Sequence, residues 1–445
     1  MLIDKCEKMG RTKRKRRKKS DFQSSVKRLD PDSRIIELLK FLGIKTNLQL
    51  FNFPNAGRGL RTSNVIRAND YLIRVPLNKM ITRSTVQDQY PSHWSTQLML
   101  ACFILENDRK FSTDWSIYKR TLPESYDVPY FDCSKKDIIE SLPLFLRNQI
   151  RTQSRLIQKQ YKQAKTIIQV DEKTFAWAWF SVNTRGVYYP DGHDNLALAP
   201  YLDMFNHNPE VEVKIEILDG HYHIRSLQDW GKHDQVFINY GPHDNTKLYV
   251  EYGFVLRDHP YDSLPLTLHD LLNVLKDRNE DAVSEKKIET IRQHKLDQNL
   301  RIFKNDEIVS WSVLACLYIL ILDETSTSTP KNVFEQDLNL TDFSAEIQSI
   351  LERQVNQISK AQQKCCIILQ KGVSNLKNDA TTPTSKVEEE DDDDIDDDLE
   401  GHASFLKQTN NSCQQPSVLP VLLDIYYRLC EQGLKQLKLI RLQKN

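Results

Sequence analysis

The chain has 445 residues, 39% of them hydrophobic and 9% aromatic, which suffices for two or three folded domains. Its 61 basic and 61 acidic residues cancel, so the net charge identifies no class of partner and only local charge is informative. The eight cysteines form no CxxC pair and no Cys/His cluster with zinc spacing, which argues against a zinc site and for reduced thiols in an intracellular protein.

The first distinctive segment is strongly basic and reads RTKRKRRKK at residues 11–19. Such a run repels itself, so we expect residues 1–30 to form a disordered arm. Its function is either a nuclear localisation signal or a contact to nucleic acid, and the simpler alternative is a solvated tail. We expect no sequence-specific binding of nucleic acid, and a location in both the nucleus and the cytoplasm.

The sequence shows no sign of secretion or membrane insertion. The N-terminus lacks the apolar core of a secretory signal. The longest apolar run, 313–322, has about half the length needed to cross a bilayer and instead predicts a buried helix. We therefore expect a soluble protein without a membrane partner.

Residues 31–260 alternate between helical and strand-like patterns. A short amphipathic helix is predicted at 31–42, because its leucines and isoleucines fall on one face. Alternating segments broken by Pro and Gly follow and indicate strands and tight turns, and apolar residues at helical spacing mark about 84–180. Strand-like patterns return at about 196–256, where EVEVKIEI alternates with period two and a turn is expected at Asp219-Gly220.

From residue 265 to the end the pattern is helical, and the stripe of apolar residues in 341–370 predicts a helical bundle. One interruption is the acidic run EEEDDDDIDDDLE at 388–400, which cannot fold because its charges repel and its apolar content is low. We expect a disordered loop at about 376–414. It is a solvated insertion by default, and binding of a basic partner such as a histone tail is the alternative.

Three short segments could carry chemistry. In the first, Asn55 to Leu60, Gly57 and Gly59 let the backbone approach a ligand closely, although an ordinary tight turn explains the same pattern. It is not a dinucleotide-binding fingerprint, because no strand–GxGxxG–helix unit surrounds it.

The second segment is LDMFNH, which ends in Asn206 and His207 at a junction between an apolar run and a new strand. The third comprises INYG, with Tyr240, and EYGF, with Tyr252 and Phe254. Taken alone, the histidine is more often a satisfied core residue than a catalytic one, and the tyrosines suit strand ends packed against a core.

The order of these motifs resembles that of the SET-domain methyltransferases. The surrounding NTRGVYY, APYLDMFNH and INYGPHDNTKLYVEYGFVL are similar to the branch typified by the Rubisco large-subunit methyltransferase. The resemblance implies an α+β fold. A knotted, β-rich SET domain at 31–260, with a helical insert at about 85–180, would precede an all-α substrate-binding domain at 261–445. In the knot, the strand ending at Tyr240 would thread beside Asn206 and His207.

The resemblance also implies S-adenosylmethionine as cofactor and a lysine of another protein, histone or non-histone, as methyl acceptor. By this matching the Tyr240 hydroxyl orients the methyl group and the amine, and the backbone carbonyls of Arg185 and Asp203 point at the amine. The implied cofactor-binding residues are Arg58, Gly59 and Leu60 through their main chains, the Asn206 amide, the His207 backbone, Tyr240, and the aromatic walls Tyr252 and Phe254. No metal is expected.

Two alternatives stay open at this point. A relative in the branch methylates histidine, and the choice of acceptor depends on side chains around residues 184–187. A non-catalytic scaffold would use the basic arm and the acidic loop to tether chromatin or ribosomal partners. The presence of Asn206, His207 and Tyr240 together argues against a decayed site. We expect a monomer whose partner is its protein substrate.

Overall fold

The computed structural model describes residues 33–54, 56–110, 114–131, 136–276, 284–304, 307–321, 333–334, 337–379 and 418–444. The predicted basic arm, residue Asn55 of the first motif and most of the predicted acidic loop lie outside these ranges. Within them, no helix is both long and apolar enough to span a membrane.

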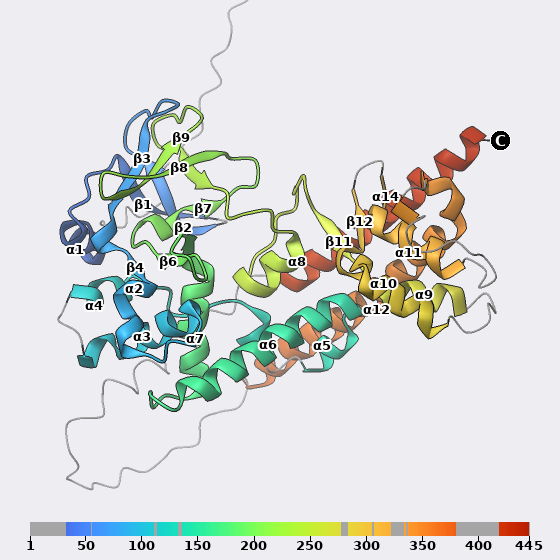
Figure 1. Ribbon diagram of the computed structural model, residues 1–445, viewed down its shortest axis with the longest axis horizontal. Helices are drawn as coiled ribbons and strands as arrows, with labels where there is room; N and C mark the ends of the chain where they lie inside the picture. Colours follow the sequence, from blue (N-terminus) through green and yellow to red (C-terminus); the bar gives the residue numbers. More distant parts are fainter. Residues whose placement is uncertain are drawn as a thin grey trace, which may run out of the picture.

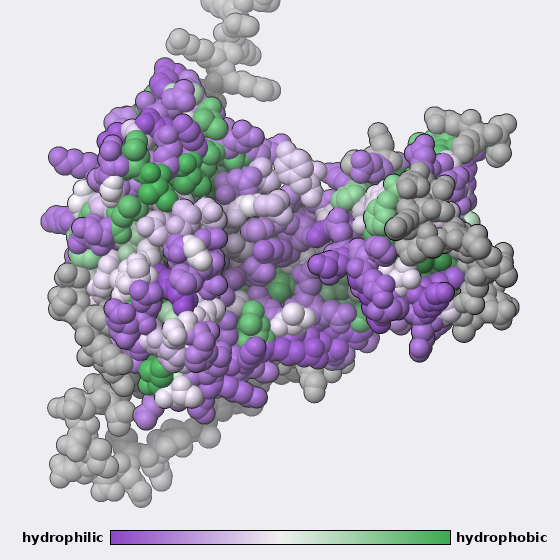
Figure 2. Space-filling view, viewed as in Figure 1, coloured by the Kyte–Doolittle hydropathy of each residue, from purple (hydrophilic) through white to green (hydrophobic). Residues whose placement is uncertain are grey.

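The molecule has a β-rich part at one end and a helical part at the other (Figure 1). Small sheets with α1 (Ser33–Leu42) form the first part, α6 and α8 lie between the two, and α14 runs from near α8 through the helical part. Polar side chains cover most of the face in Figure 2, while hydrophobic side chains gather over β8 and β9.

The sheet nearest the sequence motifs has four strands in the order β1-β2-β10-β7. The β1–β2 hairpin is antiparallel, and β10 runs antiparallel to β2 and parallel to β7. Phe237 pairs with Asn206 and Ile238 with His207, so the strand before Tyr240 does lie beside the Asn-His segment. The strands are β1 (Leu48–Phe53), β2 (Gly57–Thr62), β7 (Asn206–His207) and β10 (Gln235–Ile238).

Two further three-stranded sheets have the orders β3-β9-β8 and β4-β6-β5. The predicted turn at Asp219-Gly220 joins β8 to β9, and both residues have positive φ, 50° and 72°, as a tight hairpin turn requires. The strands are β3 (Tyr71–Pro76), β4 (Ile81–Thr82), β5 (Gly186–Tyr188), β6 (Leu196–Leu198), β8 (Val213–Leu218) and β9 (His221–Ser226).

Helices occupy the region where the insert is predicted. The last of them, α7, begins at an N-cap, Asp171, whose carboxylate accepts the N–H of Thr174 at 2.8 Å, and it ends at Arg185. The helices are α2 (Arg83–Val86), α3 (Thr96–Lys110), α4 (Asp114–Lys119), α5 (Lys136–Ser141), α6 (Leu144–Ala164) and α7 (Glu172–Arg185).

The C-terminal part is mainly helical, but the expectation of an all-α domain is wrong in one detail. Strands β11 (Ser263–Pro265) and β12 (Arg301–Phe303) form an antiparallel pair. Each is three residues long, too short to show an alternating pattern in sequence. Two short elements, α8 (Asn245–Lys247) and η6 (Leu248–Tyr252, a π-helical turn), precede this part. Its helices are α9 (Leu268–Lys276), α10 (Glu285–Gln293), α11 (Trp311–Ile321), α12 (Ser344–Asp379) and α14 (Val418–Lys444).

Helix α12 continues to Asp379, so it overlaps the predicted start of the acidic loop at about 376. Single 3₁₀ turns connect several elements. They are η1 (Leu77–Lys79), η2 (Gln87–Gln89), η3 (Pro129–Phe131), η5 (Leu202–Met204), η7 (Leu296–Asn299) and η9 (Leu340–Phe343).

Two hydrophobic cores form within the described residues. The first joins the sheets to α1, α3 and α7, and the second joins the C-terminal helices. Helix α6 belongs to both: Phe145, Leu146 and Ile150 are buried in the second core, and Ile157 and Ala164 in the first.

Candidate active site

A cavity of about 200 Å³ lies where β7, the end of β10, the C-terminus of α7 and η6 converge. Seven residues predicted from the motifs line it, together with five others. The predicted ones are Arg58, Arg185, Asp203, Asn206, Tyr240, Tyr252 and Phe254, and the others are Pro123, Tyr126, Thr184, Met204 and Phe205. The fold therefore brings residues from distant parts of the sequence to one site.

Three predicted residues lie next to the cavity without lining it. Leu60 is fully buried in β2, opposite Val236, and His207 is buried beneath Tyr240. A Cβ atom at Gly59 would lie 2.5 Å from Nδ2 of Asn206. Glycine is therefore what allows the Asn206 amide to lie against β2.

Tyr240 is held by hydrogen bonds at both its backbone and its hydroxyl. Its N–H donates to Nδ1 of His207 at 3.1 Å, and its hydroxyl donates to the carbonyl oxygen of Phe205 at 2.5 Å. Burial raises the pKa of the Tyr240 phenol above its ordinary value. The side chain is therefore a neutral phenol at physiological pH, with oxygen lone pairs left free by the bond to Phe205.

His207 supports Tyr240 from below. The two rings stack with centroids 5.0 Å apart and an interplanar angle of 22°. Because Nδ1 accepts the Tyr240 N–H, the proton of the neutral imidazole is on Nε2, and burial lowers the pKa of His207 to about 4. The imidazole is thus neutral at physiological pH and acts as a positioning group.

A buried ion pair forms another wall. Nη1 of Arg185 lies 3.0 Å from a carboxylate oxygen of Asp203, and the Asp203 side chain is fully buried. The same nitrogen donates to the Asp203 carbonyl at 3.1 Å, and the Tyr118 hydroxyl donates to the carboxylate at 2.8 Å. The Asp203 carbonyl, predicted to face the acceptor amine, already accepts one hydrogen bond, so that role would use its second lone pair.

Arg58 adds a second guanidinium at the cavity, partly buried although the residue as a whole is exposed. Its Nη1 donates to the carbonyl of Thr121 at 2.9 Å. Burial, and then the positive charge of Arg185, lower the pKa of Arg58, although an arginine stays protonated at physiological pH. The cavity lining holds two arginines and one aspartate, so one positive charge is in excess.

Aromatic rings close the remaining side. Tyr252 lies 5.5 Å from Tyr240 and 6.2 Å from Phe254, centroid to centroid. Gly253 between them has φ +82°, and a Cβ there would lie 2.5 Å from the carbonyl oxygen of Asp127. This explains the glycine in EYGF, because only glycine lets η6 end with both rings at the cavity.

The insert contributes residues that the sequence motifs do not indicate. Tyr118 and Tyr126 belong to no motif, and only their position in a helical insert near the site could have indicated them. For Arg58 the resemblance implied a role for the main chain only, whereas the residue also lines the cavity. In the part of the chain that the structure describes, no group of His, Cys, Asp and Glu residues is suited to hold a metal ion.

Comparison with known proteins matches residues 57–241 to the family model of the SET domain. SET domain-containing protein 4 of Homo sapiens is 30% identical over 362 residues, covering 73% of this chain and 81% of the relative. The chain belongs to the SET-domain family.

Two other relatives share shorter stretches of this SET-domain chain. The ribosomal lysine N-methyltransferase set11 of Schizosaccharomyces pombe is 31% identical, over 50% of this chain and 60% of its own. The actin-histidine N-methyltransferase of Xenopus tropicalis is 28% identical, over 54% and 46%. Because the chain is similar to both enzymes, similarity alone does not decide whether the methyl acceptor is lysine or histidine.

The fold is also that of a solved SET-domain protein. The structure of LSMT bound to lysine and AdoHcy aligns with a TM-score of 0.59 at 16% identity, covering 93% of this chain and 91% of that one. The alignment includes the C-terminal helical region, so both parts of this SET-domain chain follow the same overall architecture.

Proposed function

We propose that this chain is an S-adenosylmethionine-dependent methyltransferase that methylates a lysine side chain of another protein. The observation that carries the proposal is the neutral phenol of Tyr240, fixed in the wall of a cavity beside Asn206 and enclosed by aromatic rings. Membership of the SET-domain family supports it, as do a lysine-methylating relative and a neighbour solved with lysine and AdoHcy.

The residues present fit the cofactor. Nδ2 of Asn206, at the cavity, is buried and has no hydrogen-bond partner among the described residues, so a ligand acceptor would satisfy it. The excess positive charge from Arg58 and Arg185 suits the carboxylate of the cofactor's methionine portion. When bound, S-adenosylmethionine supplies a methyl group activated by a positively charged sulfur.

The chain's own residues would make the acceptor reactive by environment rather than by a base. A free lysine has a pKa near 10.4, so it is protonated and inert at neutral pH. Burial against the rings of Tyr252 and Phe254 would disfavour the charged form, and the proton would leave to solvent as the lysine side chain enters. The Tyr240 oxygen then orients the neutral amine, and the aromatic wall excludes water.

The test is transfer of labelled methyl from S-adenosylmethionine to histones, ribosomal proteins and a lysate panel. We expect labelling by the wild type, and a loss of at least about a hundredfold in kcat for Tyr240→Phe, because the phenol oxygen is removed from the reacting atoms. Tyr261→Phe is the matched control, since Tyr261 is 69% exposed and outside the cavity. A wild type without activity on the whole panel would overturn the proposal.

A histidine acceptor is the second candidate, favoured by the similarity to the actin-histidine enzyme. Mass spectrometry of the labelled residue separates the two. Methyl-lysine is expected, and methylhistidine as the sole product would replace the lysine assignment.

We also propose that histones are among the substrates and that the protein occupies both nucleus and cytoplasm. The basic segment at 11–19 supports both points. Replacing its basic residues with glutamine in a fluorescent fusion should remove nuclear signal, and an unchanged distribution would contradict the location.

A further inference from the structure

The segment that follows Tyr240, α8 with η6, contributes to the cavity on one side and contacts the C-terminal region on the other. We propose that Arg301 is a positioning residue. Through its ion pair with Asp244 it holds this segment, and with it Tyr240 and Tyr252, in the geometry required for methyl transfer. The inference rests on the proposed function. Arg301 itself does not line the cavity.

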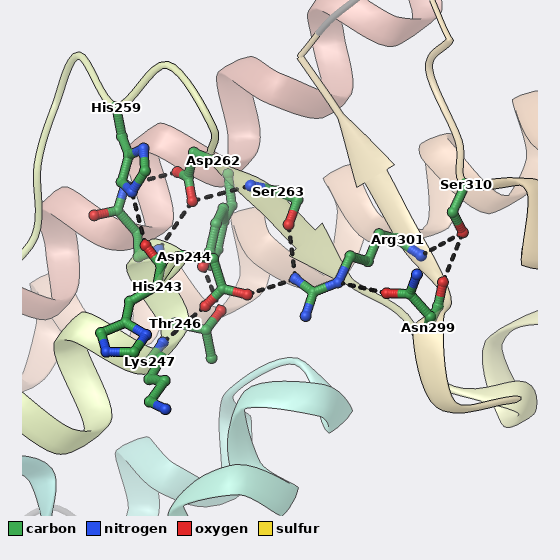
Figure 3. Close-up of polar contacts among 12 residues, drawn as sticks. His243, Asp244, Thr246, Lys247, His259, Asp262, Ser263, Asn299, Arg301 and Ser310 are labelled. Carbon is green, nitrogen blue, oxygen red and sulfur yellow. Dashed lines mark hydrogen bonds and ion pairs between the residues drawn. The ribbon is translucent and has the colours of Figure 1, made fainter. Parts of the chain in front are cut away.

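The ion pair lies at the start of α8 (Figure 3). Asp244 caps the helix, accepting the N–H of Lys247 at 2.9 Å with one oxygen, and its other oxygen lies 2.5 Å from Nη1 of Arg301. Arg301, on β12, also donates to Oγ of Ser263 at 2.8 Å and to Oδ1 of Asn299 at 3.0 Å. The guanidinium is thus fixed by three acceptors, and the Asp244 side chain is only 10% exposed.

The next two residues of α8 are held as firmly. Asn245 donates its N–H and its side-chain amide to the carboxylate of Asp262, at 2.9 and 2.6 Å, and exchanges two hydrogen bonds with the backbone of Leu256. The hydroxyl of Thr246 bonds to that of Tyr426 on α14. Lys247 of α8 pairs with Glu251 in η6, whereas these bonds of Asp244, Asn245 and Thr246 lead to the chain after η6 and to the C-terminal region.

A displacement of α8 would shift two residues that line the cavity, Tyr240 and Tyr252. Three residues separate Tyr240 from Asp244, and they form a tight turn in which His243 N–H donates to Gly241 O at 2.8 Å. In the other direction α8 runs directly into η6, which ends at Tyr252. Tyr240, through this turn, and Tyr252, through the continuous α8–η6 backbone, are thus both connected to Asp244, the residue that Arg301 holds.

The ion pair is better suited to positioning than to adding stability. Two charges taken from water lose solvation that their attraction only partly returns, so such a pair adds little net stability. It does specify one orientation, because the planar guanidinium reaches Asp244, Ser263 and Asn299 together. Small errors of alignment in an active site can lower the rate on the order of a hundredfold.

A double-mutant cycle tests the inference on the full-length protein. Asp244→Asn removes the charge but keeps the cap, because asparagine caps helices about as well as aspartate. Arg301→Gln removes the partner. For each single variant we expect kcat to fall about tenfold, the KM for the protein substrate to change less than twofold, and the Kd for S-adenosylmethionine to rise. The double variant should be no worse than either single one.

Two further variants control for general damage. Arg301→Lys keeps the charge and should restore part of kcat. Arg428→Gln removes an exposed ion pair with Asp424 on α14, whose side chains are 74% and 36% exposed, and should leave every parameter unchanged. Circular dichroism melting of each variant identifies any that are unfolded at the assay temperature.

Wild-type kcat and Kd in both folded single variants would overturn the inference, as would additive losses in the double variant. If the wild type binds S-adenosylmethionine but methylates nothing, the proposed function fails, and the Kd values alone decide the role of Arg301. If the wild type shows no saturable binding, both proposals fail.

Discussion

His207 is a buried imidazole that folding keeps neutral, and this makes stability depend on pH. Burial lowers its pKa to about 4, whereas in the unfolded chain it titrates near 6.5. Between these values the unfolded chain binds the extra proton and the folded chain does not. The contribution to stability is therefore fully present above about pH 6.5 and is lost as the pH falls toward 4.

Because of His207, we expect the free energy of unfolding to fall by about 2 kcal/mol when the pH is lowered from 7 to 5. His243 contributes in the same direction, because burial lowers its pKa to about 4 as well. His207→Asn retains an acceptor for the Tyr240 N–H but cannot titrate. We expect this variant to be less stable at pH 7, and its free energy of unfolding to fall less than that of the wild type between pH 7 and pH 5. Urea denaturation at both pH values measures this, and equal losses in the two proteins would rule the mechanism out.

At the scale of residues, the sequence predicted the part of the site that depends on local motifs. Asn206, Tyr240 and Phe254 could be found because their neighbours leave a recognisable pattern, including glycines that sterics require. Tyr118 and Tyr126 reach the site only because the insert folds back over it, and no local pattern records that approach.

Helix α6 is the element that connects the two cores. It has 21 residues and so is roughly 31 Å long, enough to bury one end in each core. The two ends carry their own apolar residues, Phe145 and Ile150 in one core and Ile157 in the other. A rigid helix shared in this way should make the two cores unfold together.

We therefore expect one calorimetric unfolding transition for the wild type. Ser154→Pro, in the middle of α6, should destabilise the protein by about 3 kcal/mol or more and split the transition in two, because the shared helix is interrupted. Ser154→Ala preserves helix propensity and should keep a single transition. Two separate transitions already in the wild type would contradict the connecting role of α6.

At the scale of elements, length decided what could be predicted. The helix at 31–42 and the β8–β9 turn were found from periodicity and from Asp219-Gly220. The alternation in EVEVKIEI correctly indicated a strand, but Ile215 and Ile217 stay 49% and 40% exposed, because β8 is an edge strand at the limit of the core. An alternating pattern specifies which side chains share a face and leaves open how far the core extends beneath it.

The whole molecule consists of a SET domain and a helical region that are connected close to the cavity. Sequence resemblance predicted both parts, but it did not predict that α6 and Arg301 would join them. These contacts pair residues far apart in the chain, and a single sequence carries no record of such pairs. Because of these contacts, ligand binding in one part should stabilise the other part against local unfolding.

Cofactor binding should therefore protect backbone amides well beyond the cavity. A ligand at 100 times its Kd stabilises the folded state by about 2.7 kcal/mol, and that stabilisation spreads as far as cooperative contacts reach. With saturating S-adenosylmethionine, we expect slower hydrogen exchange at β7 and η6, and also at β12 and around Tyr426 of α14. In Arg301→Gln, the slowing of hydrogen exchange at β12 and around Tyr426 should disappear, while the slowing at β7 persists. Hydrogen exchange with mass spectrometry resolves these segments, and protection confined to the cavity in the wild type would show that the two parts are not coupled.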